Sequence, residues 1–271
     1  MALQCLRVGV GRLRGAKQVS ESTTQQPLTL AIDVGGTGLK ASVLDESGKM
    51  VEKHVRMPTP NPCTPDILVE ALTKLTAALT SYERISIGFP GVVRDGAIVT
   101  APHFKGKAWR DFPLANTLAR RFGKPVRLLN DAEVQGLGII KGQGLEVVLT
   151  LGTGLGSAVF SNGTLTPHLE LAHHPIGKGE TYNDYVGNAA RLALSSRRWN
   201  RRVLKVIKVV HALLHYDVLY LGGGNAAKVT VTLPDNVHIA SNDAGITGGI
   251  RLWDEAVWSG ALGGRAASSG R

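Results

Sequence analysis

Two glycine-rich stretches of this chain contain the same four residues, GTGL, and both are candidates for binding phosphate. The first spans Gly36–Leu39 and the second Gly152–Leu155, each between apolar runs typical of β-strands. In such a turn, backbone N–H groups can point at a phosphate without a Cβ in the way, and the threonine adds a hydroxyl donor. A single turn of this kind more often only reverses the chain. Two in register favour a phosphate chain gripped from both sides of a cleft.

Acidic side chains stand at the ends of two predicted strands. Asp131 follows the apolar run VRLLN, and the carboxyl ends of strands open into the ligand crevice of α/β sheets. Asp131 is therefore a candidate base, the N-cap of the next helix, DAEVQGLGII, or both. Asp33 precedes the first glycine turn, where phosphates would repel it unless a cation lay between them, so it suggests Mg²⁺ held through water. Together with two phosphate turns, these acids indicate a phosphotransferase.

Two further groups could contact a substrate. The segment ELAHHP carries Glu170 and His173, a pair that is more often a surface pair or half of a metal site. A zinc site would need more ligands, and the following PIGKGETYNDYVG contains no cysteine, so we interpret the pair as hydroxyl-binding groups and expect no zinc. Glycines at 222–224, before Asn225, end a later strand and allow close approach of a flat or charged ligand, although this signal is weak alone.

The elements that position these residues are predicted to form a repeat. Each GTGL follows one strand and precedes another, and each second strand ends in a turn, at Gly48 or Gly163. The recurrence of strand, glycine turn, strand and turn predicts two related half-domains.

Further elements are predicted around the first turn. MVEKHVRM, at 50–57, is expected to be a third strand, and ISIGFP another. A helix should begin with Thr64 as its N-cap and Pro65 as its first residue, with leucines repeating along one face. PLANTLARRFG is predicted as a helix that ends at Gly123, before the strand VRLLN.

A basic helix is predicted within an acid-free stretch that runs from Tyr185 to Tyr216. In SRRWNRRVLKVIKVVHALL, the basic residues on one face are Arg198, Arg201, Lys205 and Lys208, and the apolar residues on the opposing face are Val203, Ile207, Val210 and Leu214. A solvated helix face usually mixes signs, so an unmixed stripe beside a phosphate cleft favours an extended polyanion. Nucleic acid is not expected, because the chain shows no recognition motif and is only 5% aromatic.

The composition of the chain limits which classes of protein it can belong to. The chain is 43% hydrophobic and long enough for one large domain or two ordinary ones, and no apolar run approaches the roughly 18 residues of a membrane span. Cys5 and Cys63 have no metal-ligand or disulfide spacing, which fits a reducing compartment such as the cytoplasm. Residues 1–27 form a basic extension, either a targeting segment or a mis-assigned start, and the Gly/Ala/Ser-rich tail at 259–271 is expected to be disordered. The net charge of +10 favours polyanionic partners.

Together, these residues resemble the ROK family of sugar kinases, within the actin-like, ribonuclease H-like ATPase superfamily, over nearly all of 28–258. DVGGTGLK and LGTGLGSAV are similar to the family's two phosphate motifs, and LGGGN and NDAGITGG, with Gly248 and Gly249, to its segments around the nucleotide. The resemblance implies an α/β fold with two domains around a ligand cleft. The smaller would span 28–130 plus about 250–258, and the larger 131–249.

The resemblance also implies roles for individual residues. It makes Asp131 the base that acts on the sugar hydroxyl. The sugar-binding residues would be Gly91, His103, Asn130, Asp131, Glu170, His173 and Asn183. The phosphate-binding residues would be Asp33, Gly35, Gly36, Thr37, Gly38, Lys40, Gly152, Thr153, Gly154 and Gly156. The residues near a nucleotide or polyphosphate would be Gly222, Gly223, Gly224, Asn225, Arg198, Arg201, Lys205 and Lys208. Two positions depart from the family, since His103 stands where an asparagine is usual and Asn183 near a usual glutamate.

A narrower resemblance concerns the phosphoryl donor. HHPIGKGETYNDYVGNAA, RRWNRRV and YLGGGNAAK are similar to the polyphosphate glucokinase branch, in which the zinc-binding cysteines of other ROK kinases are absent, as they are here. This resemblance implies phosphoryl transfer from inorganic polyphosphate, or also ATP, to the 6-hydroxyl of glucose, with Mg²⁺ as cofactor, by a cytoplasmic homodimer with no membrane partner.

Two alternatives remain open. One is a strictly ATP-dependent ROK hexokinase for glucose, mannose or fructose, in which the basic helix is merely solvated. The other is a non-enzymatic ROK regulator that binds DNA. That reading expects a winged-helix domain in front of the kinase-like part, and 27 residues are too few to fold one.

Overall fold

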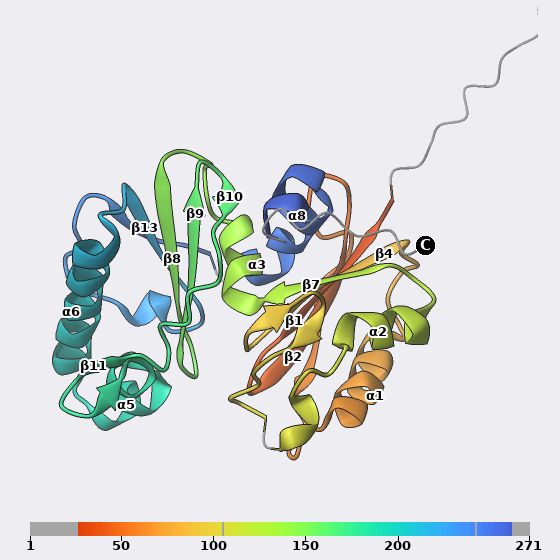
Figure 1. Cartoon of the computed structure of the whole chain (residues 1–271), viewed down its shortest axis with the longest axis horizontal. Helices are drawn as coiled ribbons and strands as arrows, with labels where there is room; N and C mark the ends of the chain where they lie inside the picture. The colour runs from red at the N-terminus through yellow and green to blue at the C-terminus, as the bar shows by residue number, and fades with distance from the viewer. Residues whose placement is uncertain (1–26, 105, 242, 262–271) are drawn as a thin grey trace, which may run out of the picture.

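The computed structural model describes residues 27–104, 106–241 and 243–261, and two mixed sheets of five strands lie side by side within it (Figure 1). The first sheet has the order β3-β2-β1-β4-β7. Its strands are β1 (Thr29–Val34), β2 (Gly38–Leu44), β3 (Val55–Pro58), β4 (Arg84–Phe89) and β7 (Val126–Asn130). β1 is antiparallel to β2 and parallel to β4, which is in turn parallel to β7.

The second sheet repeats this plan. Its order is β10-β9-β8-β13-β14, so that strands three, two, one, four and five of each half lie in the same sequence. Its strands are β8 (Leu145–Leu151), β9 (Leu155–Ser161), β10 (Thr164–Leu165), β13 (Val218–Gly222) and β14 (Val237–Ile239). Here too the first strand is antiparallel to the second and parallel to the fourth. The predicted repeat is thus a repeat of topology.

Helices cover the sheets as their apolar faces require. Helices α1 (Pro65–Thr76) and α2 (Leu114–Phe122) pack on one face of the first sheet. In β8, Val147 and Leu149 face α6 (Ser196–Leu214), whereas Val148 faces α3 (Asp131–Leu137) and α8 (Glu255–Ala261). Figure 1 accordingly shows α6 at the outer edge of the molecule and α3 and α8 between the two sheets.

Short elements complete the described chain. They are β5 (Val93–Arg94), β6 (Ala97–Ile98), η1 (Lys107–Trp109), β11 (Pro175–Gly177), β12 (Glu180–Thr181), α4 (Tyr182–Val186), α5 (Asn188–Ala193), η2 (Ala226–Lys228), α7 (Ala244–Thr247) and η3 (Gly248–Trp253). No helix of the described residues is long and apolar enough to cross a bilayer.

Most predicted elements are confirmed, but the third strand is shorter than expected. Thr64 caps α1, Gly123 ends α2 in the left-handed conformation, and α6 covers the whole predicted stretch. The prediction of one strand over 50–57 is wrong in its first half. Met50 forms only an isolated bridge, and β3 begins at Val55. Between them the chain leaves the sheet, and half of the Val51 side chain is in solvent.

The end of the described chain returns to the first sheet. Ser86 Oγ donates to Gly249 O over 2.6 Å, and Arg127 donates to Leu252 O over 2.7 Å. The Arg127 guanidinium also stacks on the rings of Trp253 and Trp258. Because α8 packs against β10 as well, this segment joins both halves, and the predicted domain bounds stay a prediction. The prediction of a disordered tail from 259 is wrong at its start, because α8 continues to Ala261. The predictions for 1–26 and 262–271 lie outside the described residues.

Candidate active site

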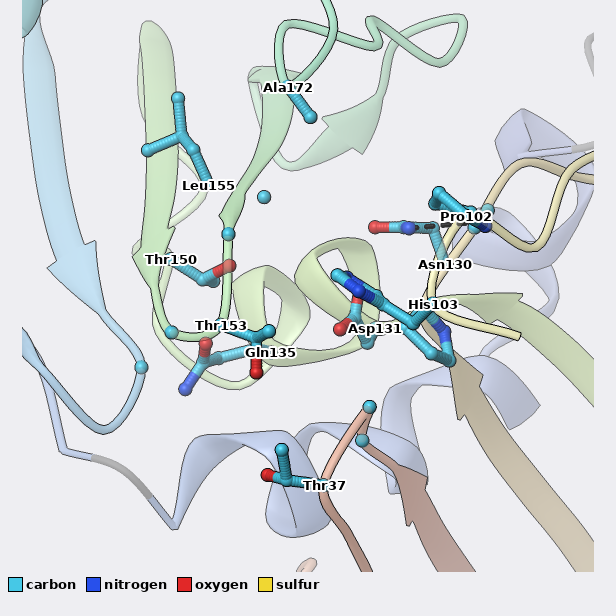
Figure 2. A pocket seen from close by; sticks show the side chains of 18 of the residues that line it. Thr37, Pro102, His103, Asn130, Asp131, Gln135, Thr150, Thr153, Leu155 and Ala172 are labelled. Atoms are coloured by element: carbon cyan, nitrogen blue, oxygen red, sulfur yellow. Dashed lines mark hydrogen bonds between the residues drawn. The ribbon is translucent and has the colours of Figure 1, made fainter. Parts of the chain in front are cut away.

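A pocket of about 310 Å³ opens where strands of both sheets end and α3 begins (Figure 2). Residues that follow β1, β4, β7, β8 and β13 all line it, so the predicted crevice at the carboxyl ends of the strands is present. The predicted phosphate-binding residues that line it are Asp33, Gly35, Gly36, Thr37, Gly38, Lys40, Gly152, Thr153, Gly154 and Gly156. The predicted sugar-binding residues that line it are Gly91, His103, Asn130, Asp131, Glu170, His173 and Asn183.

Asp131 is the first residue of α3 and projects into this pocket (Figure 2). The cap of the helix is Asn130, whose Oδ1 accepts from Ala132 N over 2.9 Å, while Glu133 Oε2 accepts from Asn130 N over 3.1 Å. The interpretation of Asp131 as N-cap is therefore wrong, because Asn130 and Glu133 already form a capping box. Burial and, to a smaller extent, the nearby Asp33 charge raise the pKa of Asp131 to about 7. Such a carboxyl can accept a proton near neutral pH.

The first glycine turn carries a charged pair. Asp33 on β1 lies opposite Lys40 on β2, with Lys40 Nζ 3.2 Å from Asp33 Oδ2. Burial raises the pKa of Asp33, and Lys40 opposes that rise. The turn is closed by Gly35 N, which donates to Gly38 O over 2.9 Å, and Thr59 Oγ1 donates to Gly35 O over 2.7 Å. The carboxylates of Asp33 and Asp131 repel each other, and carboxylate oxygens are the ligands Mg²⁺ prefers, so this wall of the pocket fits the predicted cation.

The second glycine turn is held by asparagines. Leu155 N donates to Asn183 Oδ1 over 2.7 Å, and Asn225 Nδ2 donates to Gly152 O over 3.1 Å. Asn188 N, at the start of α5, donates to the same carbonyl over 3.1 Å. Asn183, predicted to contact sugar, and Asn225, predicted to lie near the donor, therefore both support the phosphate turn. Whether either also touches a substrate stays a prediction.

A histidine that sequence reasoning missed, His168, contacts the sugar-side residue Glu170 but does not itself line the pocket. His168 Nδ1 lies 2.7 Å from Glu133 Oε1, and its Nε2 lies 3.4 Å from Glu170 Oε2. Although burial lowers its pKa, the two carboxylates raise it to about 9. Asn130-x-x-Glu133 is a capping-box pattern visible in the sequence, but nothing in the sequence connects His168 to it. Gln135, Thr150 and Gly245 do line the pocket and were also missed.

His103 stands between the sugar side and the first glycine turn. A Cβ built on Gly36 would lie 3.1 Å from His103 Cγ, so the imidazole packs over that glycine. Burial lowers the pKa of His103, as does the neighbouring His173, whereas Glu170 raises it. The predicted sugar contacts Glu170 and His173 are thus close to His103.

Several predicted donor-binding residues do not reach the pocket. Gly223 and Gly224 line it, whereas Gly222 is buried against Gln135. Gly248 and Gly249 are packing glycines, since a Cβ on Gly248 would collide with α3 and one on Gly249 would lie 3.1 Å from Ala31 and Ser86 in the first sheet.

The basic stripe also lies apart from the pocket. Arg198, Arg201, Lys205 and Lys208 are exposed on α6, as predicted, but none of them lines the cavity. The stripe was expected beside the cleft, and the structure corrects this. The apolar face of α6 packs on the sheet face opposite to α3, so the stripe points away from the pocket.

Among the described residues, no group of three or more His, Cys, Asp or Glu side chains is placed to hold a metal ion. The prediction that the protein binds no zinc is not tested by this observation.

Comparison with known proteins identifies the family. The model of the ROK family matches residues 29–170, slightly more than half of the chain. This chain belongs to the ROK family. The polyphosphate glucokinase of Mycobacterium tuberculosis (strain ATCC 25618 / H37Rv) is 29% identical over 220 residues, which cover 78% of this chain and 83% of that relative. The N-acetylmannosamine kinase of Escherichia fergusonii is 37% identical over 145 residues, or 51% of this chain and 48% of that protein.

Solved structures agree with the predicted fold. The inorganic polyphosphate/ATP-glucomannokinase from Arthrobacter sp. strain KM matches with a TM-score of 0.77 and 29% identity, over 83% of this chain and 97% of that one. A ROK family glucokinase from Streptomyces griseus, solved with glucose and AMPPNP, matches with a TM-score of 0.73 at 21% identity, over 83% and 98% of the two chains. These similarities confirm the actin-like fold and the resemblance to the polyphosphate glucokinase branch, and they support a sugar kinase of the ROK family.

Proposed function

We propose that this ROK protein transfers a phosphoryl group from inorganic polyphosphate, with ATP as a second donor, to the 6-hydroxyl of glucose. The observation that carries the proposal is that a half-buried carboxyl with a pKa of about 7, Asp131, shares one pocket with both glycine turns. A proton acceptor and two phosphate cradles are the parts that phosphoryl transfer to a hydroxyl needs.

In the proposed reaction, Asp131 accepts the proton of the sugar hydroxyl as that oxygen attacks the terminal phosphorus of the donor. Glu170, His173 and Asn130 hydrogen-bond the other hydroxyls and hold the reacting one in line. Backbone N–H groups of the two turns hold the donor's phosphates, and Lys40 adds a positive charge beside them. Mg²⁺, when bound near Asp33, would neutralise charge on the transferred group.

Polyphosphate is proposed as the donor because two relatives that align over most of this chain are named for it. The alternative of a strictly ATP-dependent hexokinase gains from one observation, the position of the basic stripe on the far face of the second sheet. N-acetylmannosamine is a further candidate acceptor, since a kinase for it is 37% identical over half of the chain.

A donor and acceptor screen tests the proposal. The purified protein is given ATP or long-chain polyphosphate with glucose, mannose, fructose or N-acetylmannosamine, and the sugar phosphate is measured. We expect phosphorylated glucose with both donors, loss of activity in EDTA and recovery with Mg²⁺ alone. Activity with ATP only would reject the polyphosphate assignment, and no sugar phosphate with any pair would reject the kinase.

The proposal includes a homodimer in the cytoplasm that contains no zinc. Light scattering of the purified protein checks the oligomeric state, and elemental analysis checks the metal. A monomer, or stoichiometric zinc, would contradict the corresponding statement.

A further inference from the structure

His168 connects two acidic residues that come from different elements of the site. It lies in the loop between β10 and β11, with Nδ1 2.7 Å from Glu133 of α3 and Nε2 3.4 Å from Glu170 of its own loop. The side chains of His168 and Glu133 are only 17% and 7% exposed. Because ionised carboxylates only accept hydrogen bonds, both ring nitrogens must donate, and the ring must carry a proton on each.

The hydrogen bonds continue from Glu133 to the start of α3, the helix that carries Asp131. Glu133 uses its second oxygen, Oε2, to accept from Asn130 N, and Asn130 Nδ2 donates to Gly91 O over 3.1 Å. At the other end, Glu170 Oε1 accepts from Ala172 N over 3.2 Å. One chain of hydrogen bonds thus runs from the sugar-side glutamate, through the imidazole, to the residue before Asp131.

We propose that His168 is a positioning residue that holds Glu170 against the sugar with one ring nitrogen and the start of α3 with the other. The inference rests on the proposed function, because both ends of the connection belong to that site. Charge-assisted hydrogen bonds of this kind are short and strong, and removal of the imidazolium leaves the buried Glu133 charge without its cation.

Two substitutions of His168 each remove one of its two hydrogen bonds and keep the other. His168→Asn keeps an amide near the position of Nδ1, so it retains the bond to Glu133 and loses the one to Glu170. His168→Gln reaches the position of Nε2, so it retains the bond to Glu170 and loses the one to Glu133. We expect H168N to raise the KM for the sugar about tenfold with kcat nearly kept, since Glu170 loses the charged donor that holds it. We expect H168Q to lower kcat about tenfold with that KM nearly kept.

The assays use the sugar and donor that the wild-type protein phosphorylates best, so failure of glucose as the substrate would not count against His168. Thermal unfolding is measured alongside, because a purely structural role would lower Tm in both variants without separating KM from kcat. That result would overturn the proposal.

A second measurement needs no activity. Nitrogen NMR of the histidine rings, with H168N used for assignment, should show both nitrogens of His168 protonated at pH 7.5. A neutral ring at that pH would overturn the proposal even if the protein proves to be a kinase. A doubly protonated ring in a protein that phosphorylates no sugar would reject the proposed function and leave the two-sided connection in place.

Discussion

The two glycine turns occupy equivalent places in two sheets of the same strand order, yet different side chains surround them. In the first half, Asp33 lies opposite Lys40, and the two form a charged pair beside the turn. In the second half, the corresponding strand positions hold Thr150 and Gly156, which are uncharged. Both halves therefore have the glycine turn, but only the first half has charged side chains beside it. We infer that the first turn contributes charge to the phosphate site, whereas the second contributes the shape of its backbone.

The turns also differ in how they are closed. Four residues, 35–38, join the paired positions Val34 and Leu39, whereas three residues, 152–154, join Leu151 and Leu155. Each turn has one backbone hydrogen bond of its own, from Gly35 N to Gly38 O and from Gly152 N to Gly154 O. The first turn is held in addition by Thr59, and the second by the side chains of Asn183 and Asn225. The second turn should therefore depend more on its neighbours.

The largest effect is expected at the junction of the halves, where α3 begins. Asp131→Asn keeps the shape but cannot accept a proton, so kcat should fall roughly 10²–10⁴-fold. In the wild type, kcat should rise with pH through about 7, because only the ionised carboxylate is a base. Steady-state kinetics from pH 5.5 to 8.5 measure both.

The stability of the wild-type fold should fall as the pH rises, whereas kcat should rise. The fold raises the pKa of Asp131 from 3.8 to about 7, so ionisation costs the folded state stability progressively from about pH 4 to pH 7. D131N removes that cost, and its Tm should exceed that of the wild type by more at pH 8 than at pH 5. Near-full turnover in D131N, or a lower Tm at pH 8, would contradict the role of Asp131 as a base whose pKa the fold raises.

The next largest effect is expected when the charge of the basic stripe on α6, in the second half, is reversed. Replacement of Arg198, Arg201, Lys205 and Lys208 with Glu should raise the KM for long polyphosphate at least tenfold and flatten its salt dependence, since each lost phosphate contact removes about 0.7 from the log–log slope. Because the stripe lies beyond the pocket, polyphosphate of a few units and ATP should be unaffected. The matched control replaces Lys49, Lys53, Lys74 and Arg120, which are exposed on the first half, and carries the same charge change.

Equal losses in both variants would mean that net charge, and not the stripe, attracts the polyanion. No change with long polyphosphate would show that α6 is an ordinary solvated helix. The KM for glucose should stay near the wild-type value in either case, because Val203, Ile207 and Val210 on the core face are untouched.

The sequence predicted the parts of the site that depend on local patterns. The glycine turns, the strand before Asp131 and the cap of α1 each involve neighbouring residues, and all were located correctly. The position of the stripe could not be predicted. β8 is covered on both faces, by α6 on one and by α3 and α8 on the other, and the burial of both faces does not tell from the sequence which of them receives α6. The pairing of His168 with Glu133 joins residues that only the packed loop brings together.

The smallest effects concern closure of the turns. In the second turn, a Cβ on Gly154 would overlap Asn183 Oδ1, whereas one on Gly152 would meet no atom within 4 Å. In the first turn, a Cβ on Gly35 would lie 2.8 Å from Gly38 O, which is backbone and cannot rotate away. Steric strain of this kind typically costs about 1–3 kcal/mol. We therefore expect Tm to fall most in Gly35→Ala, less in Gly154→Ala and hardly at all in Gly152→Ala.

The dependence of the second turn on Asn183 gives the sharpest form of this test. If Gly154→Ala acts by displacing that side chain from Leu155 N, Asn183→Ala should destabilise the protein by a similar amount, about 1 kcal/mol. The double variant should then lose little more than either single one, because both changes break the same hydrogen bond. Denaturant unfolding of the four proteins measures the coupling. Additive losses would show that Asn183 does not hold the turn, and the inference that the second turn depends on asparagine side chains would fail.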